Sequence, residues 1–415
     1  MTAPSLQELT RVFGRIGLLS FGGPAAQIAL MHRELVETRA WLSEDGFLRA
    51  LSLCMLLPGP EAMQLATYAG WRLRGTLGGL IAGLLFVIPG ALVILALALG
   101  YALYGQVPLV QAAFEGIKAA VIIIVLQALL KVSGKALTTR SAWALAGAAF
   151  VALFVFGLPF PLIIAAAALY GALTQNAAST DTAIPPSAPP RTLVTCLIWG
   201  SLWALPVLIL WITNQTFLTQ IALFFSKLAV VTFGGAYAVL AYMTQTVVQD
   251  FGWITTAQMI DALGLAETTP GPLILVTEFV ALLAGFAQGG IGLALAAGAI
   301  ALWVTFTPCF LWIFLAGPYL DKISQKPRLS AALSAITAAV VGVILSLAIW
   351  FAIHVLFADV GTPAWGAMPV PEVASMNFAA LGLTILAAGL LLGVKRGMVE
   401  TLAFMALAGL ALSFL

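Results

Sequence analysis

Residues 13–24 read FGRIGLLSFGGP, and a stretch with the same glycine pair, KLAVVTFGGAYAVL, returns at residues 227–240. A second motif returns as well, because LLPGPEAMQLATYAGW at 56–71 corresponds to ETTPGPLILVTEFVA at 267–281. Residues 9–64 match residues 221–276 without a gap, at a constant offset of 212. Self-similarity over such a length indicates a tandem duplication.

The duplication divides the chain into three parts. We expect a first repeat at 1–174, a linker with an unpaired apolar helix at 175–213, and a second repeat at 214–415. Residues 175–191 are polar and rich in proline, which is typical of a loop.

The composition indicates a protein of the lipid bilayer. Of the 415 residues, 62% are hydrophobic and 8% are charged, against roughly a quarter charged in a soluble domain. Apolar stretches of about 20 residues, the length that crosses a membrane, recur along the chain. We therefore expect an all-α polytopic membrane protein. A net charge of +2 without a basic patch argues against nucleic-acid binding.

The number of apolar segments predicts two repeats of inverted topology. Each repeat has six segments and 192–213 is unpaired, so seven crossings separate equivalent points. Gly and Pro cut the first two segments of each repeat into halves too short to span. Because hairpins place all loop Lys and Arg on one side, we favour about nine full spans plus four re-entrant hairpins over thirteen simple spans. The hairpins are 9–36 and 47–72 from the cytoplasm, and 221–245 and 258–283 from outside.

The four breaks predict an anion site. A break at membrane depth is tolerated where it lines a cavity, and the free N–H groups of the helix that follows it attract negative charge. Glycines let the backbone approach a ligand, and Ser20 and Thr232 supply hydroxyls. The glycines also have a structural interpretation, close helix packing. The candidate substrate-binding residues are Arg15, Ser20, Phe21, Gly22, Gly23, Pro58, Gly59, Pro60, Gln64, Lys227, Thr232, Phe233, Gly234, Gly235, Thr268, Thr269, Pro270, Gly271 and Pro272.

Charged residues inside apolar sequence are further candidates. Arg15 and Lys227 occupy the same repeat position, and we expect both to face the central site; snorkelling toward the headgroups is the alternative. Candidate proton carriers for coupling are Glu61, Glu267 and Glu278, the first two with helix capping as the alternative role. Glu115 and Lys118 are spaced to neutralise each other.

The paired FGG and PGP motifs, together with the duplication, closely resemble the chromate ion transporter family of long, ChrA-like chains. The resemblance covers nearly the whole chain. It implies efflux of chromate across a bacterial inner membrane with resistance as the result, and sulfate as a related anion. The expected topology is multi-pass, with a cytoplasmic N-terminus and a periplasmic C-terminus. Protons and a second copy of the chain are candidate partners. Ala236 stands where the first repeat has Pro24, and Leu273 where it has Glu61, so the halves are expected to contribute unequally.

Other functions fit the sequence less well. Two histidines and three scattered cysteines offer no repeated metal-ligand spacing, and there is no GxxxxGK[ST] loop for ATP. The sequence therefore predicts no cofactor, no metal site and no enzyme activity. An anion channel and a carrier for uptake of sulfate or another oxyanion stay as alternatives.

Overall fold

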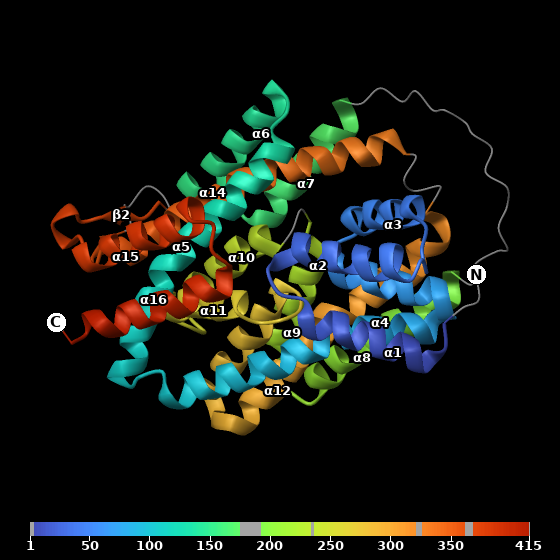
Figure 1. Ribbon diagram of the computed structural model, residues 1–415, viewed down its shortest axis with the longest axis horizontal. Helices are drawn as coiled ribbons and strands as arrows, with labels where there is room; N and C mark the ends of the chain where they lie inside the picture. Colours follow the sequence, from blue (N-terminus) through green and yellow to red (C-terminus); the bar gives the residue numbers. More distant parts are fainter. Residues whose placement is uncertain (1–3, 175–191, 234–235, 321–325, 362–367, 415) are drawn as a thin grey trace. The chain divides into compact units, whose positions relative to one another are not determined.

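The computed structural model describes residues 4–174, 192–233, 236–320, 326–361 and 368–414. Helices dominate these residues, as Figure 1 shows. The only sheet of the described residues pairs two short antiparallel strands, β1 (Val360–Gly361) with β2 (Val370–Pro371). The expectation of an all-α polytopic membrane protein is confirmed.

The first repeat and the connecting helix contain eight α-helices and two π-helices within the described residues. They are α1 (Leu6–Leu19), α2 (Gly23–His32), η1 (Arg33–Thr38), α3 (Glu44–Leu56), α4 (Glu61–Tyr104), α5 (Pro108–Ala136), α6 (Arg140–Phe150), η2 (Val151–Val155), α7 (Phe160–Thr174) and α8 (Thr192–Ile212).

The second repeat follows the same order of helices. Its described elements are α9 (Thr216–Val231), α10 (Ala236–Thr244), η3 (Gln245–Asp250), α11 (Thr256–Glu267), η4 (Leu273–Leu275), α12 (Val276–Ala316), η5 (Gly317–Tyr319), α14 (Pro327–Leu356), η6 (Val373–Ser375), α15 (Phe378–Ala388), η7 (Gly389–Gly393) and α16 (Met398–Leu412).

The two repeats share element bounds as well as motifs. The π-helices η1 and η3 begin and end at residues with the same offset of 212 that the sequence motifs have. Likewise α6, η2 and α7 correspond end for end to α15, η7 and α16. Irregular π turns recur at equivalent places, so the duplication extends to local backbone geometry.

Within the described residues, five helical stretches are long and apolar enough to cross a membrane. They are Glu61–Tyr104, Pro108–Ala136, Thr192–Ile212, Leu273–Tyr319 and Pro327–Leu356. Four other apolar helical stretches, Arg140–Val155, Phe160–Thr174, Phe378–Gly393 and Met398–Leu412, occupy places where we expected full spans. At about 1.5 Å per residue a helix of 15 residues covers about 22 Å, less than the roughly 30 Å hydrocarbon core. These four are therefore shorter than simple spans require.

Helix α8 has an outer surface that suits lipid. All of its residues are described and none is buried, although the helix is apolar throughout. Leu193 is 72% exposed and Trp211 is 68% exposed. Such a surface is unfavourable in water and compatible with hydrocarbon.

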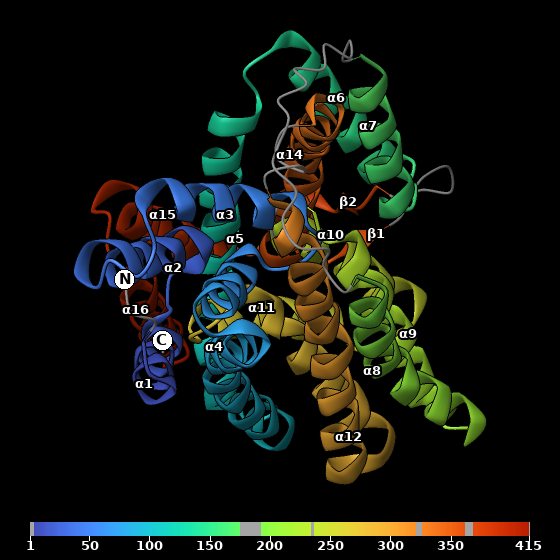
Figure 2. The same ribbon diagram turned by 90° about the vertical axis from the view of Figure 1, so that its right-hand side faces the viewer.

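The chain forms two compact units. The first unit comprises residues 1–99, 175–236 and 269–330, and the second comprises residues 100–174, 237–268 and 331–415. In the first unit, α8 and α9 both pack on α12, as Figure 2 shows. Each unit therefore takes segments from both repeats.

A hairpin begins the first unit. Arg15 on α1 forms an ion pair with Glu34 on η1, with Nη1 and Oε1 3.7 Å apart. In one continuous helix the two residues would be about 28 Å apart along the axis, so the chain folds back at the break. The predicted fold-back of residues 9–36 is present, while its depth in the bilayer stays a prediction.

Sharp turns end the half-segments that follow the PGP motifs. Within α4 the helix breaks at Arg74 and Gly75, and within α12 it breaks at Gly289 and Gly290. Gly75 and Gly290 have closely similar dihedral angles, with φ of 64° and 72°. Since a positive φ strains other residues, glycine suits both turns. Across each turn the helix packs back on itself, because a Cβ atom at Gly70 would overlap the carbonyl oxygen of Gly78, and one at Gly285 would lie 2.7 Å from that of Leu293. The long helices are therefore each two antiparallel pieces.

The second unit is built around α5. Helices α15 and α16 pack on it in Figure 1, with a core that includes Ile123, Leu383 and Met405. A Cβ atom at Gly116 would overlap the carbonyl of Met405, so α5 and α16 touch through their backbones. Small residues at such a contact are typical of helix pairs in membranes.

Candidate functional site

Among the described residues, two backbone hydrogen bonds join the breaks of the two repeats. The N–H of Gly59 donates to the carbonyl of Thr232 at 2.8 Å, and the N–H of Gly271 donates to the carbonyl of Ser20 at 2.9 Å. Gly271 is the repeat counterpart of Gly59, and Thr232 is the counterpart of Ser20. Each bond is therefore the repeat counterpart of the other, as expected for a contact between two halves that a two-fold axis relates.

A small cavity lies where these breaks meet in the first unit. Its volume of about 10 Å³ accommodates about one water molecule. Residues from all four breaks line it: Pro24 and Gln27, then Pro60, Glu61 and Ala62, then Thr232 and Ala236, and last Pro272, Leu273 and Ile274.

Helix starts surround the cavity. Gly22 is the N-cap of α2 and gives no side-chain cap, and Pro24 is in the first turn. Helix α4 begins at Glu61, directly after Pro60, and α10 begins at Ala236. Uncapped N–H groups at helix starts give a positive potential. The lining therefore favours negative charge through its backbone.

Glycine is required at the second break. Gly59 has a φ of 122°, and a Cβ atom there would lie 2.8 Å from Nε2 of Gln64 and 3.0 Å from Sγ of Cys309. Its counterpart Gly271 has a φ of 89°, and a Cβ atom would lie 3.2 Å from the carbonyl oxygen of Phe86. Both positions combine a conformation that side chains disfavour with close neighbours.

The two predicted hydroxyls bond to their own helices. Ser20 Oγ donates to the carbonyl of Ile16 and Thr232 Oγ1 to the carbonyl of Leu228, each at 2.6 Å. In this conformation their hydrogens are therefore not directed at a ligand, since Ser and Thr readily bond the carbonyl four residues back.

Arg15 and Lys227 are not part of the cavity lining. Both are exposed, and the Arg15 side chain is 61% exposed. Helix α1 buries a stripe that includes Val12, Phe13 and Ile16, and position 15 lies outside that stripe. Lys227 is likewise outside the buried stripe of α9. Neither cation lines this cavity in the described conformation, and their expected role at the site stays a prediction.

The three predicted carboxyl groups lie in different surroundings. Glu61 lines the cavity. Glu267 is buried in the second unit and accepts a hydrogen bond of 2.6 Å from Tyr237. Glu278 is buried on α12, and its Oε2 has no hydrogen-bond partner among the described residues. Their coupling roles stay predictions.

Of the other predicted residues, some stabilise the turns and others lie outside the cavity lining. Gln64 is fully buried and donates to the carbonyl of Pro58 at 2.7 Å, which holds the PGP turn. Phe21 is 39% exposed, and Thr268 donates to the carbonyl of Leu265. The remaining predicted neighbours, Pro58, Phe233, Thr269 and Pro270, are outside the lining. Gly234 and Gly235 lie outside the described residues.

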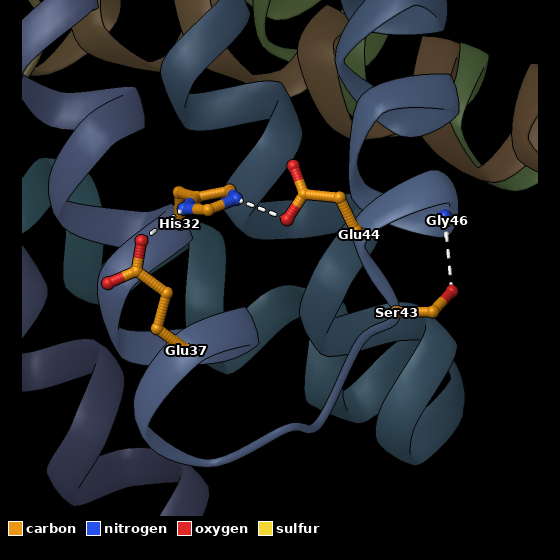
Figure 3. A network of polar contacts seen from close by, with 5 residues as sticks. All are labelled: His32, Glu37, Ser43, Glu44 and Gly46. Carbon is orange, nitrogen blue, oxygen red and sulfur yellow. Dashed lines mark hydrogen bonds and ion pairs between the residues drawn. The ribbon is translucent and has the colours of Figure 1, made fainter.

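The segment between the first two hairpins carries a polar network, which Figure 3 shows. His32 lies between two carboxylates, with Nε2 2.7 Å from Glu44 and Nδ1 3.1 Å from Glu37. Ser43 caps α3 by accepting from the N–H of Gly46. The hydrogen bond with Glu44 and the nearby charges raise the pKa of His32 above 6.5, against the lowering effect of burial. This network therefore joins the end of α2 to the start of α3 most strongly when His32 is protonated.

Two groups of residues were not predicted from the sequence. Gln27 donates from Nε2 to the carbonyls of Gly271 and Ser20, at 2.7 and 3.2 Å, and so links the two repeats. Asp261 is 3% exposed in the second unit, where Tyr101 and Lys118 approach it. Both are lone polar residues in apolar runs, a signal that applies to intramembrane sites in general.

A family model described as "Chromate transporter" matches residues 7–172 and again residues 219–413. The chain belongs to the chromate transporter family. The two matches show that each half of this chromate transporter family member has the family's sequence pattern.

Relatives in this family have similar length. A "Probable chromate transport protein" of Synechococcus elongatus is 34% identical over 346 residues, covering 82% of this chain and 83% of that one. A "Chromate transport protein" of Cupriavidus metallidurans is 31% identical, covering 83% of this chain and 82% of the relative. One from Pseudomonas aeruginosa is 33% identical, covering 82% and 79%. No solved structure matches this chain.

Proposed function

We propose that this chromate transporter family member is a secondary carrier that exports chromate, with sulfate as a related substrate, across the bacterial inner membrane and so gives chromate resistance. Relatives named chromate transport proteins support the substrate. One observation supports the mechanism above all. The breaks of both repeats meet at one cavity, where they are joined by two backbone hydrogen bonds that the repeat symmetry relates to each other.

The electrostatics of the cavity suit an oxyanion. Each helix start contributes about half a positive charge, and several of them line one small space. The N–H groups of Gly59 and Gly271 now donate to carbonyls of the opposite repeat. When released, the same N–H groups are donors for the oxygens of a bound anion.

The small volume of the cavity implies that binding requires movement. A space of about 10 Å³ is too small for a tetrahedral oxyanion, which is larger than a water molecule. We propose that the Gly59–Thr232 and Gly271–Ser20 bonds open alternately, one toward each side of the membrane. Inverted repeats allow this because each half performs the same movement in the opposite direction.

Glu61 adds a condition to anion binding. Its side chain lines the cavity, where an ionised carboxylate would repel a dianion. We propose that Glu61 is protonated when the anion is bound and then donates a hydrogen bond to it. Glu61→Gln keeps a neutral donor, so it is expected to retain anion exchange, whereas Glu61→Leu, which copies Leu273 of the second repeat, is expected to weaken it.

The membrane potential favours export of such a substrate. Moving one charge through 100 mV is worth about 2.3 kcal/mol, so an inside-negative potential of that size drives a dianion outward with about 4.6 kcal/mol. That corresponds to a concentration ratio of roughly 2,000. Uptake of sulfate by the same route would have to overcome this term.

Chromate retention by cells tests the function. Cells that express the chain in the membrane are expected to retain less chromate than cells with an empty vector, and added sulfate is expected to compete. Equal retention would refute export. In proteoliposomes a carrier shows saturation and counterflow, whereas a channel shows flux without counterflow.

A further inference from the structure

A buried ionisable cluster lies in the second unit, on residues that the cavity does not use. Asp261 on α11 has a side chain 4% exposed, and Lys118 on α5 has one 17% exposed. Nζ of Lys118 is 3.8 Å from Oδ1 of Asp261, and the hydroxyl of Tyr101 donates to Oδ2 at 2.7 Å. Oδ1 has no hydrogen-bond partner among the described residues, so one oxygen of this carboxyl can accept a proton.

The cluster is held by close packing of its helices. A Cβ atom at Gly264, one turn after Asp261, would overlap Cγ2 of Ile117, the neighbour of Lys118. The ring of Tyr101 packs edge-on against Phe114 of α5 at 5.2 Å. The three polar groups are therefore fixed by apolar contacts on either side of them.

Lys118 has two carboxyl partners at nearly equal distance. Its Nζ is 3.7 Å from Oε1 of Glu115 and 3.8 Å from Oδ1 of Asp261. Exposure falls along this series, from 53% at Glu115 to 17% at Lys118 and 4% at Asp261. Glu115 lies about 10 Å along α5 from its first residue, within reach of the membrane surface. The three residues thus form a path from the surface to the interior.

Structural stabilisation does not account for the cluster. Burying charges in a membrane protein costs several kcal/mol, and apolar residues of similar size often stabilise as well as a buried ion pair does. The equivalent position in the first repeat is Arg49, which forms an exposed pair with Asp45. The buried acid is therefore a feature of the second repeat and is not needed for the repeat fold.

We propose that Asp261, Lys118 and Glu115 form the proton site that couples anion export to the proton gradient. Asp261 binds one proton and becomes neutral, and Lys118 then pairs with Glu115 instead. Loss of the proton to water restores the Asp261–Lys118 pair. This inference rests on the proposed carrier function and adds the residues that bind the coupled proton.

Other charged groups near the cluster are accounted for. On α11 itself Glu267 is bonded to Tyr237, and on α16, which packs against α11, Glu400 is paired with Arg396 at 3.9 Å. In the proposed topology the α4–α5 connection faces the periplasm, so Glu115 is on the side from which protons enter.

Two transport assays on purified protein in vesicles separate coupling from carrying. Chromate counterflow at equal pH measures the carrier alone, and chromate redistribution after an imposed pH gradient measures coupling. Asp261→Asn is expected to keep counterflow and to lose the response to the pH gradient. Asp261→Glu is expected to keep both. The matched control Asp45→Asn, which removes an exposed acid from the equivalent helix of the first repeat, is expected to keep both.

The outcomes are distinguishable. Loss of counterflow and of the gradient response together in a folded Asp261→Asn protein would show a structural role and overturn the proposal. A gradient response retained by Asp261→Asn, or absent from the wild type, would also overturn it. Absence of counterflow in the wild type would refute the carrier function instead. Infrared difference spectra between acidic and alkaline pH then test the site alone. The wild type is expected to show a carboxylic-acid band that Asp261→Asn lacks, and identical spectra for the two proteins would exclude Asp261 as the proton acceptor.

Discussion

Substituting Gly59 by alanine tests whether the second break is as constrained as the geometry indicates. A side chain at φ 122° costs about 1–3 kcal/mol. The new methyl group would also crowd Gln64 and Cys309, at 2.8 and 3.0 Å, which adds about 1–3 kcal/mol because both neighbours are buried. We therefore expect Gly59→Ala to lower the free energy of unfolding by about 2–6 kcal/mol. The movement that relieves this crowding also displaces the N–H of Gly59 that donates to Thr232, so we expect transport to fall together with stability.

Two other glycines supply matched controls. Gly23 has a φ of 76° with no atom within 4 Å of its Cβ position, so Gly23→Ala adds strain of about 1–2 kcal/mol without crowding. Gly14 lies inside α1 with the same open space and an ordinary φ, so Gly14→Ala is expected to be neutral or to stabilise by about 0.5–1 kcal/mol. Melting temperatures in detergent, followed by size exclusion, should rank Gly14→Ala highest and Gly59→Ala lowest. Equal melting temperatures and equal transport for Gly59→Ala and Gly14→Ala would refute the argument.

Three further predictions concern charge and topology. The double variant Arg15→Gln, Lys227→Gln is expected to reduce transport several-fold when transport is normalised to the amount of this protein in the membrane. The reason is that both cations lie about 8 Å along their helices from a break. A lower amount of protein in the membrane with normal transport per molecule would indicate an anchoring role instead. Because the pKa of His32 is raised, its stabilising contact with Glu44 is complete below pH 6.5 and is lost as the pH rises through the raised pKa. The difference in melting temperature between the wild type and His32→Gln should therefore shrink at alkaline pH. A difference that does not depend on pH would contradict this. A cysteine placed at Thr38 should react with an impermeant reagent from the cytoplasmic face, and reaction from outside would favour thirteen simple spans.

The breaks were predictable because glycine and proline act locally. FGG and PGP interrupt apolar runs wherever they occur. Because both motifs occur again in the second half, the duplication could be recognised without any knowledge of packing. The turns at Gly75 and Gly290 were not predicted, because they lie outside these two motifs. The sequence did not predict which breaks form hydrogen bonds with each other, since the Gly59–Thr232 contact joins residues far apart in the sequence.

Side-chain orientation and partners were harder to predict. Arg15 has a position in the sequence that suits the central site, but the buried stripe of α1 turns it outward. Lys118 was expected to pair with Glu115, its neighbour one turn away, and it does so at 3.7 Å. Its second partner, Asp261, comes from a helix in the other repeat, and only the packing of α11 against α5 brings them together.

The small volume of the central cavity has an electrical consequence. Protons cross apolar barriers along chains of hydrogen-bonded water, and a space of about 10 Å³ holds about one molecule, which is too few for a chain. In the described conformation the unloaded first unit is therefore expected to insulate the membrane at this cavity and not to short-circuit the proton gradient. Conductance of vesicles containing the protein, measured without any transported anion, should equal that of protein-free vesicles.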